Sequence, residues 1–303
     1  MFLQSQSILK YPRTPHLEGS RLQEGDSAHD QVPLSALKDG HVVIEEKLDG
    51  ANAGVSFSEG ADLLLQSRGH YLVGGGSERQ FNLLKPWARA HEDALLDRLE
   101  DRYVMYGEWT YAKHSVFYDC LPHYFHEFDI YDRHTGEFLS TARRHALLAG
   151  SPVMSVPVLY AGPMPATGKL LWKLVQHSLA KTAAWRKSFE ATVGREGLPL
   201  ALTWQQTDKS DRSEGLYLKV EDADRVIARY KFVRQDFVQA ILDSGSHHAA
   251  RPVLPNQLAA GADIFAPVPT VTWEMLGLAT LRSCAEVAAL KDFSAADWPR
   301  RGA

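Results

Sequence analysis

Short runs rich in Val, Ile, Phe and Tyr fill much of the sequence between Val42 and Asp132, with Gly, Asp or charged clusters between them. They read HVVIEEKL, NAGVSF, DLLLQSRG, RYVMYGEWT and YFHEFDIYD. Runs of this length and composition predict β-strands, and their close succession predicts antiparallel sheet. The later runs EGLYLKV and RVIARYKFVR, joined by the turn-like EDAD, show the same pattern. Sheets therefore dominate the expected fold.

Other stretches show helical spacing. ERQFNLLKPWARAHEDALLDRLED (78–101) places apolar residues three and four apart, which predicts one helix. KLLWKLVQHSLAKTAAWRKSFEATVGREG (169–197) predicts a pair of helices that ends near Gly194 or Gly197. Between them, the prolines and glycines of 151–168 predict a loop with one short strand.

Composition bounds the class of protein. With 45% hydrophobic and 23% charged residues, the 303-residue chain resembles an ordinary folded protein. A break in composition at 242–263 predicts a domain of residues 1–240 and a small, mainly helical domain of residues 241–303. A net charge of -4 excludes a general polyanion binder but not a basic groove.

Cellular location is an expectation from absent signals. Cys120 and Cys284 give neither a disulfide framework nor a metal-ligand spacing. The first residues lack a signal-peptide pattern, and no apolar run is long enough to span a membrane. We therefore expect a cytoplasmic protein without membrane contact.

Lys47, in the stretch EEKLDGANAGVSF, admits two interpretations. Asp-Gly between alternating residues favours a hairpin, in which Lys47 is a solvated strand residue. Alternatively, Lys47 is a nucleophile, which requires that its ammonium group lose a proton. The neighbouring acids hold it charged, whereas a bound metal and an electrophilic phosphate would reverse that bias. The choice depends on whether the rest of the chain supplies a nucleotide site.

Further short patterns supply candidates for such a site. The guanidinium of Arg68 in QSRG suits phosphate or ribose, although an exposed strand arginine is the simpler explanation. Glu108 in YGEW is a candidate acceptor for ribose hydroxyls, or a surface glutamate. Phe128 in FHEFDIYDR is a candidate for stacking on a purine, although simple core packing is commoner for such a stripe.

The last patterns add charge near the end of the sheet region. EGLYLK offers the carboxylate of Glu214 to a metal or to the lysine, followed by the cation Lys219. In RYKFVR, Arg229 and Lys231 share one face of a strand, because side chains alternate with a period of two. Such a pair suits a triphosphate.

Six short patterns, taken in order, resemble the motifs of the covalent nucleotidyltransferase superfamily of polynucleotide ligases and capping enzymes. They span about residues 40–235 and read EKLDGAN, SRG, YGEW, FHEFDIYD, EGLYLK and RYKF. Each motif alone is weak, but chance must supply all of them in sequence. Asn52, GEW and FDIYD resemble most the ATP-dependent RNA ligase family, in its nick-sealing branch. The resemblance implies an α+β fold: an ATP-grasp-like nucleotidyltransferase domain of antiparallel sheets with flanking helices. The small helical C-terminal domain would take the place of an OB-fold.

The resemblance also implies a three-step reaction. Lys47 attacks the α-phosphorus of ATP, and AMP stays on the lysine. AMP then passes to the 5′-phosphate of an RNA, and a 3′-hydroxyl attacks that activated end. The expected partner is RNA with 5′-phosphate and 3′-hydroxyl ends, and an end-healing kinase or phosphatase is a candidate second partner.

Roles at the matching positions follow from the resemblance. The expected catalytic residues are Lys47, Asp49, Arg68 and Lys231. The expected nucleotide contacts are Glu46, Asn52, Arg68, Glu108, Phe128, Lys219, Arg229 and Lys231. The expected ligands of Mg²⁺ or Mn²⁺ are Asn52, Asp129 and Glu214. Arg229 departs from the family, which usually has lysine there.

Some alternatives remain. The N-terminal segment either folds over the nucleotide through Arg13, His16 or Arg21 or is a solvated surface segment. A DNA ligase or a capping-type guanylyltransferase would use the same lysine chemistry. A non-catalytic nucleic-acid-binding protein would keep the fold alone, although the intact Lys47 and Glu214 argue against that.

Overall fold

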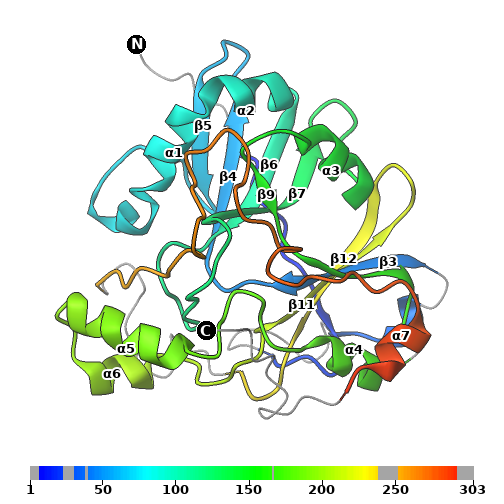
Figure 1. The fold of residues 1–303 in the computed structure, drawn as a ribbon. Helices are drawn as coiled ribbons and strands as arrows, with labels where there is room; N and C mark the ends of the chain where they lie inside the picture. Colours follow the sequence, from blue (N-terminus) through cyan, green and yellow to red (C-terminus); the bar gives the residue numbers. More distant parts are fainter. Residues whose placement is uncertain (1–6, 23–30, 38–39, 166, 238–251, 292–303) are drawn as a thin grey trace.

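Two sheets form the frame of the computed structural model (Figure 1), which describes residues 7–22, 31–37, 40–165, 167–237 and 252–291. The first sheet has the order β10-β3-β11-β12-β1-β2. Its strands are β10 (Val158–Pro163), β3 (His41–Lys47), β11 (Gly215–Glu221), β12 (Val226–Val233), β1 (His16–Leu17) and β2 (Gln31–Val32). Pairing is antiparallel except at β1, which runs parallel to both β12 and β2.

The second sheet has the order β5-β4-β6-β7-β8, and β9 pairs in parallel with β7. Its strands are β5 (Leu63–Ser67), β4 (Ala51–Phe57), β6 (Tyr103–Trp109), β7 (Phe125–Asp132), β8 (Glu137–Phe138) and β9 (Met154–Ser155). The predicted strands are thus present, and the mixed α+β class with antiparallel-rich sheets is confirmed.

Helices cover the sheets. They are α1 (Leu84–Ala90), α2 (Glu92–Leu99), α3 (Thr141–Leu148), α4 (Gly168–Leu174), α5 (Trp185–Arg195), α6 (Leu200–Gln205) and α7 (Cys284–Ala289), with the 3₁₀ helices η2 (Leu34–Leu37) and η3 (Gly76–Phe81). Trp87 of α1 and Leu95 of α2 lie in the core with Val55 of β4. Leu171 of α4 packs with Ile44 of β3 in a second core. None of the helices that the structure describes is long and apolar enough to cross a membrane.

The single helix predicted for 78–101 is wrong, because this stretch divides into η3, α1 and α2. Pro86 has no N–H to donate, so it belongs in the first turn of a helix rather than in its middle. A helix accordingly begins at Leu84, two residues before it. His91 then separates α1 from α2 with a non-helical backbone of φ −110° and ψ 14°.

The stretch after residue 251 also differs from expectation. A mainly helical character was expected, but within 252–291 the one helix is the six-residue α7. The apolar residues of this stretch are divided among clusters of the main body: Trp273 and Ile264 enter one, Val287 a second and Leu254 a third. No core of its own is therefore seen in this part of the chain, and the expected boundary at residue 240 lies outside the described residues.

The Asp-Gly sequence after Lys47 does not form a hairpin. β3 ends at Lys47 in the first sheet, and β4 begins at Ala51 in the second. Residues 48–50 therefore carry the chain from one sheet to the other, which places Lys47 at their junction (Figure 1).

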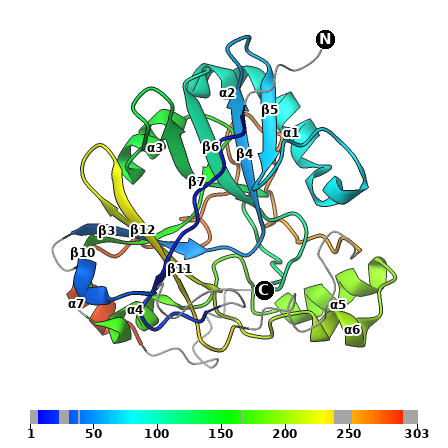
Figure 2. The ribbon, with the colours of Figure 1, turned by 180° about the vertical axis from the view of Figure 1, so that it is seen from behind.

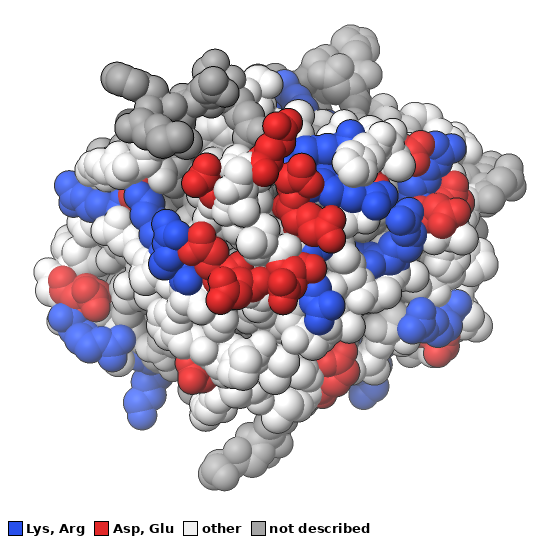
Figure 3. Space-filling view, turned by 90° about the horizontal axis from the view of Figure 1, so that it is seen from above, with Lys and Arg blue, Asp and Glu red and all other residues white. Residues whose placement is uncertain are grey.

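Charge on the face seen from above has both signs. Acidic side chains gather near the middle of this face, and basic side chains lie on either side of them (Figure 3). This face is therefore not a uniform basic surface, in keeping with the net charge of -4.

Candidate active site

A cavity of about 320 Å³ opens between the ends of the two sheets. It gathers most of the side chains that the motifs predict for a nucleotide site. The predicted residues that line it are Glu46, Lys47, Asp49, Asn52, Arg68, Glu108, Phe128, Glu214 and Lys231. They come from both sheets, so the site exists only because the chain crosses at residues 48–50.

Lys47 is paired with a carboxylate on the neighbouring strand. Its Nζ lies 2.7 Å from Glu214 Oε2, and the side chains are 25% and 3% exposed. The pairing of β3 with β11 explains this contact, because Lys47 lies opposite Gly215. A Cβ at Gly215 would lie 2.0 Å from the carbonyl oxygen of Phe232, so only glycine allows this approach of β11 to β12.

The electrostatics of this pair are unusual. Burial works against charge on Lys47, but Glu214 and Glu108 outweigh it and raise the pKa of the lysine. Burial raises the pKa of Glu214 to about 7 and that of Glu108 to about 8, although Lys47 pulls both down. Burial thus favours the neutral form of both carboxyl groups, against the effect of the neighbouring lysine.

The Gly50 backbone brings Glu108 close to the crossing. Its N–H donates to Glu108 Oε1 at 3.0 Å. A Cβ on Gly50 would lie 2.6 Å from the carbonyl oxygen of Trp109, so glycine here serves a close approach between backbones. Asn52 lies opposite Glu108 in the pairing of β4 with β6. Within the described part of the chain, the buried Oδ1 of Asn52 has no hydrogen-bond partner, which leaves one acceptor unsatisfied in the cavity wall.

Asp49 holds a loop at the mouth of the cavity. Its Oδ2 accepts hydrogen bonds from the N–H groups of Ser115 at 2.6 Å and Val116 at 2.7 Å. The adjacent His114 lines the cavity. Asp49 thus orders the loop that carries His114, a contact that the sequence alone did not indicate.

Glu46 precedes Lys47 on β3, and its side chain contacts Ser178. Its carboxylate accepts a hydrogen bond of 2.5 Å from the hydroxyl of Ser178. Burial raises the pKa of Glu46 to about 7, against the lowering effect of Ser178. Its carboxylate is thus already bonded to Ser178, and a contact of Glu46 with a nucleotide stays a prediction.

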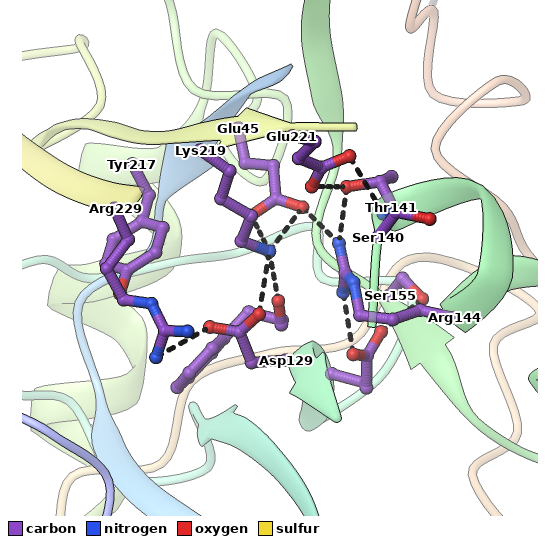
Figure 4. Close-up of polar contacts among 12 residues, drawn as sticks. Glu45, Asp129, Ser140, Thr141, Arg144, Ser155, Tyr217, Lys219, Glu221 and Arg229 are labelled. Carbon is purple, nitrogen blue, oxygen red and sulfur yellow. Dashed lines mark hydrogen bonds and ion pairs between the residues drawn. The ribbon is translucent and has the colours of Figure 1, made fainter. Parts of the chain in front are cut away.

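Three predicted residues lie outside the cavity: Lys219, Arg229 and Asp129. Lys219 is fully buried, with Nζ 2.9 Å from Glu45 Oε2 and 3.5 Å from Asp129 Oδ1 (Figure 4). The guanidinium of Arg229 lies 3.6 Å from the ring centre of Phe138, and its Nη1 is 3.7 Å from Asp129 Oδ2. The expected nucleotide contacts of Lys219 and Arg229 stay predictions. Both cations compensate buried carboxylates.

The expected metal ligands differ in their surroundings. Asp129 faces Lys219, Arg229 and the hydroxyl of Tyr11, and its role as a metal ligand stays a prediction. Among the residues that the structure describes, no group of three or more His, Cys, Asp or Glu side chains is arranged to hold a metal. Asn52 Oδ1 and Glu214 remain as oxygen donors in the cavity. They fit a magnesium-like ion that keeps waters and binds substrate phosphates, not a cage made of protein alone.

Sequence reasoning missed several lining residues: Tyr11, Thr14, Glu45, His114 and Tyr217. The period of two gives a signal for two of them, because Glu45 precedes Lys47 by two positions and Tyr217 precedes Lys219 by two. The N-terminal segment does reach the cavity, but through Tyr11 and Thr14. His16 is buried and lies 2.7 Å from the hydroxyl of Ser20.

Comparison with known proteins gives a family and similar structures. The sequence profile of the family described as RNA ligase matches residues 40–233. Two mutant forms of Naegleria gruberi RNA ligase, both solved with ATP and Mn, are similar in structure. The first has 17% sequence identity and a TM-score of 0.44, and the match covers 66% of this chain and 52% of that chain. The second has 16% sequence identity and a TM-score of 0.45, and the match covers 76% of this chain and 61% of that chain. This chain thus spans about half the length of the first. No curated protein matches the sequence.

Proposed function

Because the chain belongs to the RNA ligase family, we propose that it is an ATP-dependent RNA ligase that joins 5′-phosphate and 3′-hydroxyl ends through a lysyl-AMP intermediate. The observation that carries the proposal is the pair of Lys47 and Glu214, 2.7 Å apart in a cavity between the sheets. Asn52, Glu108 and Phe128 line the same cavity from the other sheet.

In the first step Lys47 Nζ attacks the α-phosphorus of ATP. A nitrogen–phosphorus bond forms, the bond from the α-phosphorus to the bridging oxygen breaks, and pyrophosphate leaves. Nζ must lose protons as it attacks. Glu214 is within hydrogen-bond distance of Nζ, and a pKa of about 7 suits a group that accepts a proton near neutral pH.

Placement of the nucleotide follows from the chemistry of the walls. Phe128 is half-buried and offers an aromatic face to the purine. Glu108 is the candidate acceptor for ribose hydroxyls, whereas Arg68 and Lys231 are the cations near the phosphates. Asn52 and Glu214 would hold Mg²⁺ or Mn²⁺ bound with the phosphates. The ion would neutralise charge on the phosphates and so assist the departure of pyrophosphate.

The remaining steps use the stored adenylate. The 5′-phosphate of one RNA end attacks the phosphorus of lysyl-AMP, and Lys47 leaves as the free amine. The 3′-hydroxyl of the second end then attacks the activated 5′-phosphorus, which forms the new phosphodiester and releases AMP. Both steps reuse Arg68 and Lys231 as counter-charges at phosphate oxygens.

The test is covalent labelling. Purified protein and Lys47→Ala are treated with pyrophosphate to remove any bound AMP, incubated with α-labelled ATP and magnesium, and separated by denaturing electrophoresis. We expect label on the native protein and none on the variant. An unlabelled native protein would contradict the proposal at its first step, and label from GTP but not ATP would favour the capping-type alternative.

The labelled protein is then offered substrates. We expect joining of RNA with 5′-phosphate and 3′-hydroxyl ends, tested as single strands and as a nicked duplex. Sealing of a DNA nick in preference to the matched RNA nick would show instead that the enzyme is a DNA ligase.

A further inference from the structure

The segment from Leu9 to Leu17 is fixed to both sheets and crosses the cavity between them. Figure 2 shows it in dark blue, running across the back of the molecule toward α4. At one end the hydroxyl of Tyr106 in the second sheet donates to the Leu9 carbonyl at 2.8 Å. At the other end the N–H of Lys231 in the first sheet donates to the Pro15 carbonyl at 3.0 Å. Tyr11 and Thr14, between these anchors, line the cavity.

The hydroxyl of Tyr11 ends a directed chain of hydrogen bonds. It donates to Asp129 Oδ2 at 2.5 Å and also contacts the hydroxyl of Tyr217, which lies 2.8 Å from Thr14 Oγ1. A hydroxyl has one proton, and that of Tyr11 is directed to the carboxylate. Tyr217 therefore donates to Tyr11, and Thr14 donates to Tyr217. Each donor in such a chain polarises the next.

The Tyr11 hydroxyl is closer to the Asp129 carboxylate than the two neighbouring cations are. Lys219 and Arg229 approach it only to 3.5 Å and 3.7 Å, beyond good hydrogen-bond distance. Its other oxygen, Oδ1, has no hydrogen-bond partner. Among the described residues, Tyr11 thus supplies the short hydrogen bond that fixes the orientation of this buried carboxylate.

The same two tyrosines support Phe128, the residue before Asp129 on β7. The ring centre of Phe128 lies 5.1 Å from that of Tyr11 in an edge-to-face arrangement and 6.0 Å from that of Tyr217. Such contacts fix the plane of an aromatic ring. Tyr11 therefore touches the aromatic ring in the cavity wall and, through its hydroxyl, the next residue of the same strand.

We propose that Tyr11 is a positioning residue for the nucleotide: its hydroxyl fixes Asp129 and thereby the plane of Phe128 on which a purine base stacks. The inference rests on the proposed function, because it concerns binding of ATP in that cavity. The hydrogen bonds of the Tyr11 hydroxyl go to Asp129 and Tyr217, whereas Lys47 bonds to Glu214. Loss of Tyr11 should weaken binding of ATP without changing the attack of the lysine.

The experiment measures the rate of self-adenylylation against ATP concentration for the native protein, Tyr11→Phe and Tyr106→Phe. The two variants are matched, because each removes one phenolic hydroxyl that holds the N-terminal segment or its surroundings. We expect Tyr11→Phe to raise the KM for ATP about tenfold, as for loss of a hydrogen bond to a charged group, with kcat within about twofold. Tyr106→Phe should leave KM within about twofold, since its hydroxyl only anchors Leu9.

Thermal melting accompanies each assay to show that the variants are folded. Should Tyr11→Phe not fold, Thr14→Val removes the first donor of the same chain and should raise the KM in the same direction by a smaller factor. An unchanged KM, an equal rise in both tyrosine variants, or a fall in kcat alone would overturn the inference. Absence of label on the native protein would instead overturn the proposed function, so the two failures are distinguishable.

Discussion

The cavity around Lys47 and the buried cluster around Arg144 contain similar charges in opposite states. In the cluster, Arg144 is fully buried and lies 2.6 Å from both Glu45 and Glu127. Lys219 and Arg229 complete the cluster beside Asp129, so that three cations face three carboxylates (Figure 4). In the cavity, Lys47 faces Glu214 and Glu108, whose pKa values burial raises to about 7 and about 8. Complete compensation is typical of a structural network, whereas carboxyl groups with raised pKa values in an accessible cavity are typical of a site that awaits a cation or a substrate.

The largest effect on stability should come from the cluster. Arg144→Leu leaves the buried carboxylates of Glu45 and Glu127 without their shared cation, and we expect a loss of about 3–5 kcal/mol in the free energy of unfolding. Urea denaturation measures it. Arg89→Leu is the matched control, because Arg89 forms an exposed ion pair with Glu92 and should cost less than about 1 kcal/mol. Equal losses in the two variants would remove the distinction.

Glu214→Gln should affect activity more than stability. It removes the proton acceptor 2.7 Å from Lys47, and we expect self-adenylylation to slow about 100-fold at pH 7. Glu221→Gln on the same strand is the control, since Glu221 accepts from Thr141 away from the cavity. Labelling rates of both variants at saturating ATP provide the measurement, and a rate close to native for Glu214→Gln would exclude the role of proton acceptor.

The pH dependence of the free energy of unfolding should distinguish Glu108 in the cavity from the paired carboxylates of the cluster. Burial raises the folded pKa of Glu108 to about 8, so its favourable contribution is complete below the unfolded pKa near 4.5 and is lost as pH rises through about 8. Glu108→Gln does not ionise. Its stability relative to the native protein should therefore rise by about 2 kcal/mol between pH 5 and pH 9, after allowance for partial exposure. A relative stability that is constant with pH would show that Glu108 ionises normally.

The smallest effect should come from Arg229→Lys. Arg229 lies outside the cavity, so we expect the labelling rate to stay within about twofold and stability to fall by about 1 kcal/mol from lost contact with the Phe138 ring. Lys231→Arg makes the reverse exchange two residues along the strand, inside the cavity, and should slow labelling about tenfold. A larger effect on labelling at Arg229 than at Lys231 would reverse our placement of these cations.

The sequence predicts the part of the site that depends on local pattern. Lys47, Glu108 and Glu214 lie in or beside short alternating strands, and alternation fixes which side chains share a face. The order of the motifs then resembles that of a family in which these residues share one site. The hairpin signal at Asp49 and Gly50 was misleading, because glycine there serves close backbone contact rather than a turn.

Residues whose partners lie far along the chain were beyond this reasoning. Tyr11 bonds to Asp129, 118 positions away. The segment that carries Tyr11 continues into β1, whose parallel pairing with β12 is not indicated by any sequence pattern. Asp129 and Lys219 matched the expected motif positions, yet they satisfy each other's charge. A motif gives the type of residue at a position; whether that residue faces solvent or a counter-charge depends on tertiary packing.

The crossing at residues 48–50 has a mechanical consequence. Lys47 and Glu214 move with the first sheet, whereas Asn52, Glu108 and Phe128 move with the second. A ligand that contacts residues of both sheets would bridge them, and its binding energy would oppose their separation. A bound nucleotide would therefore add to the free energy needed to separate the two sheets.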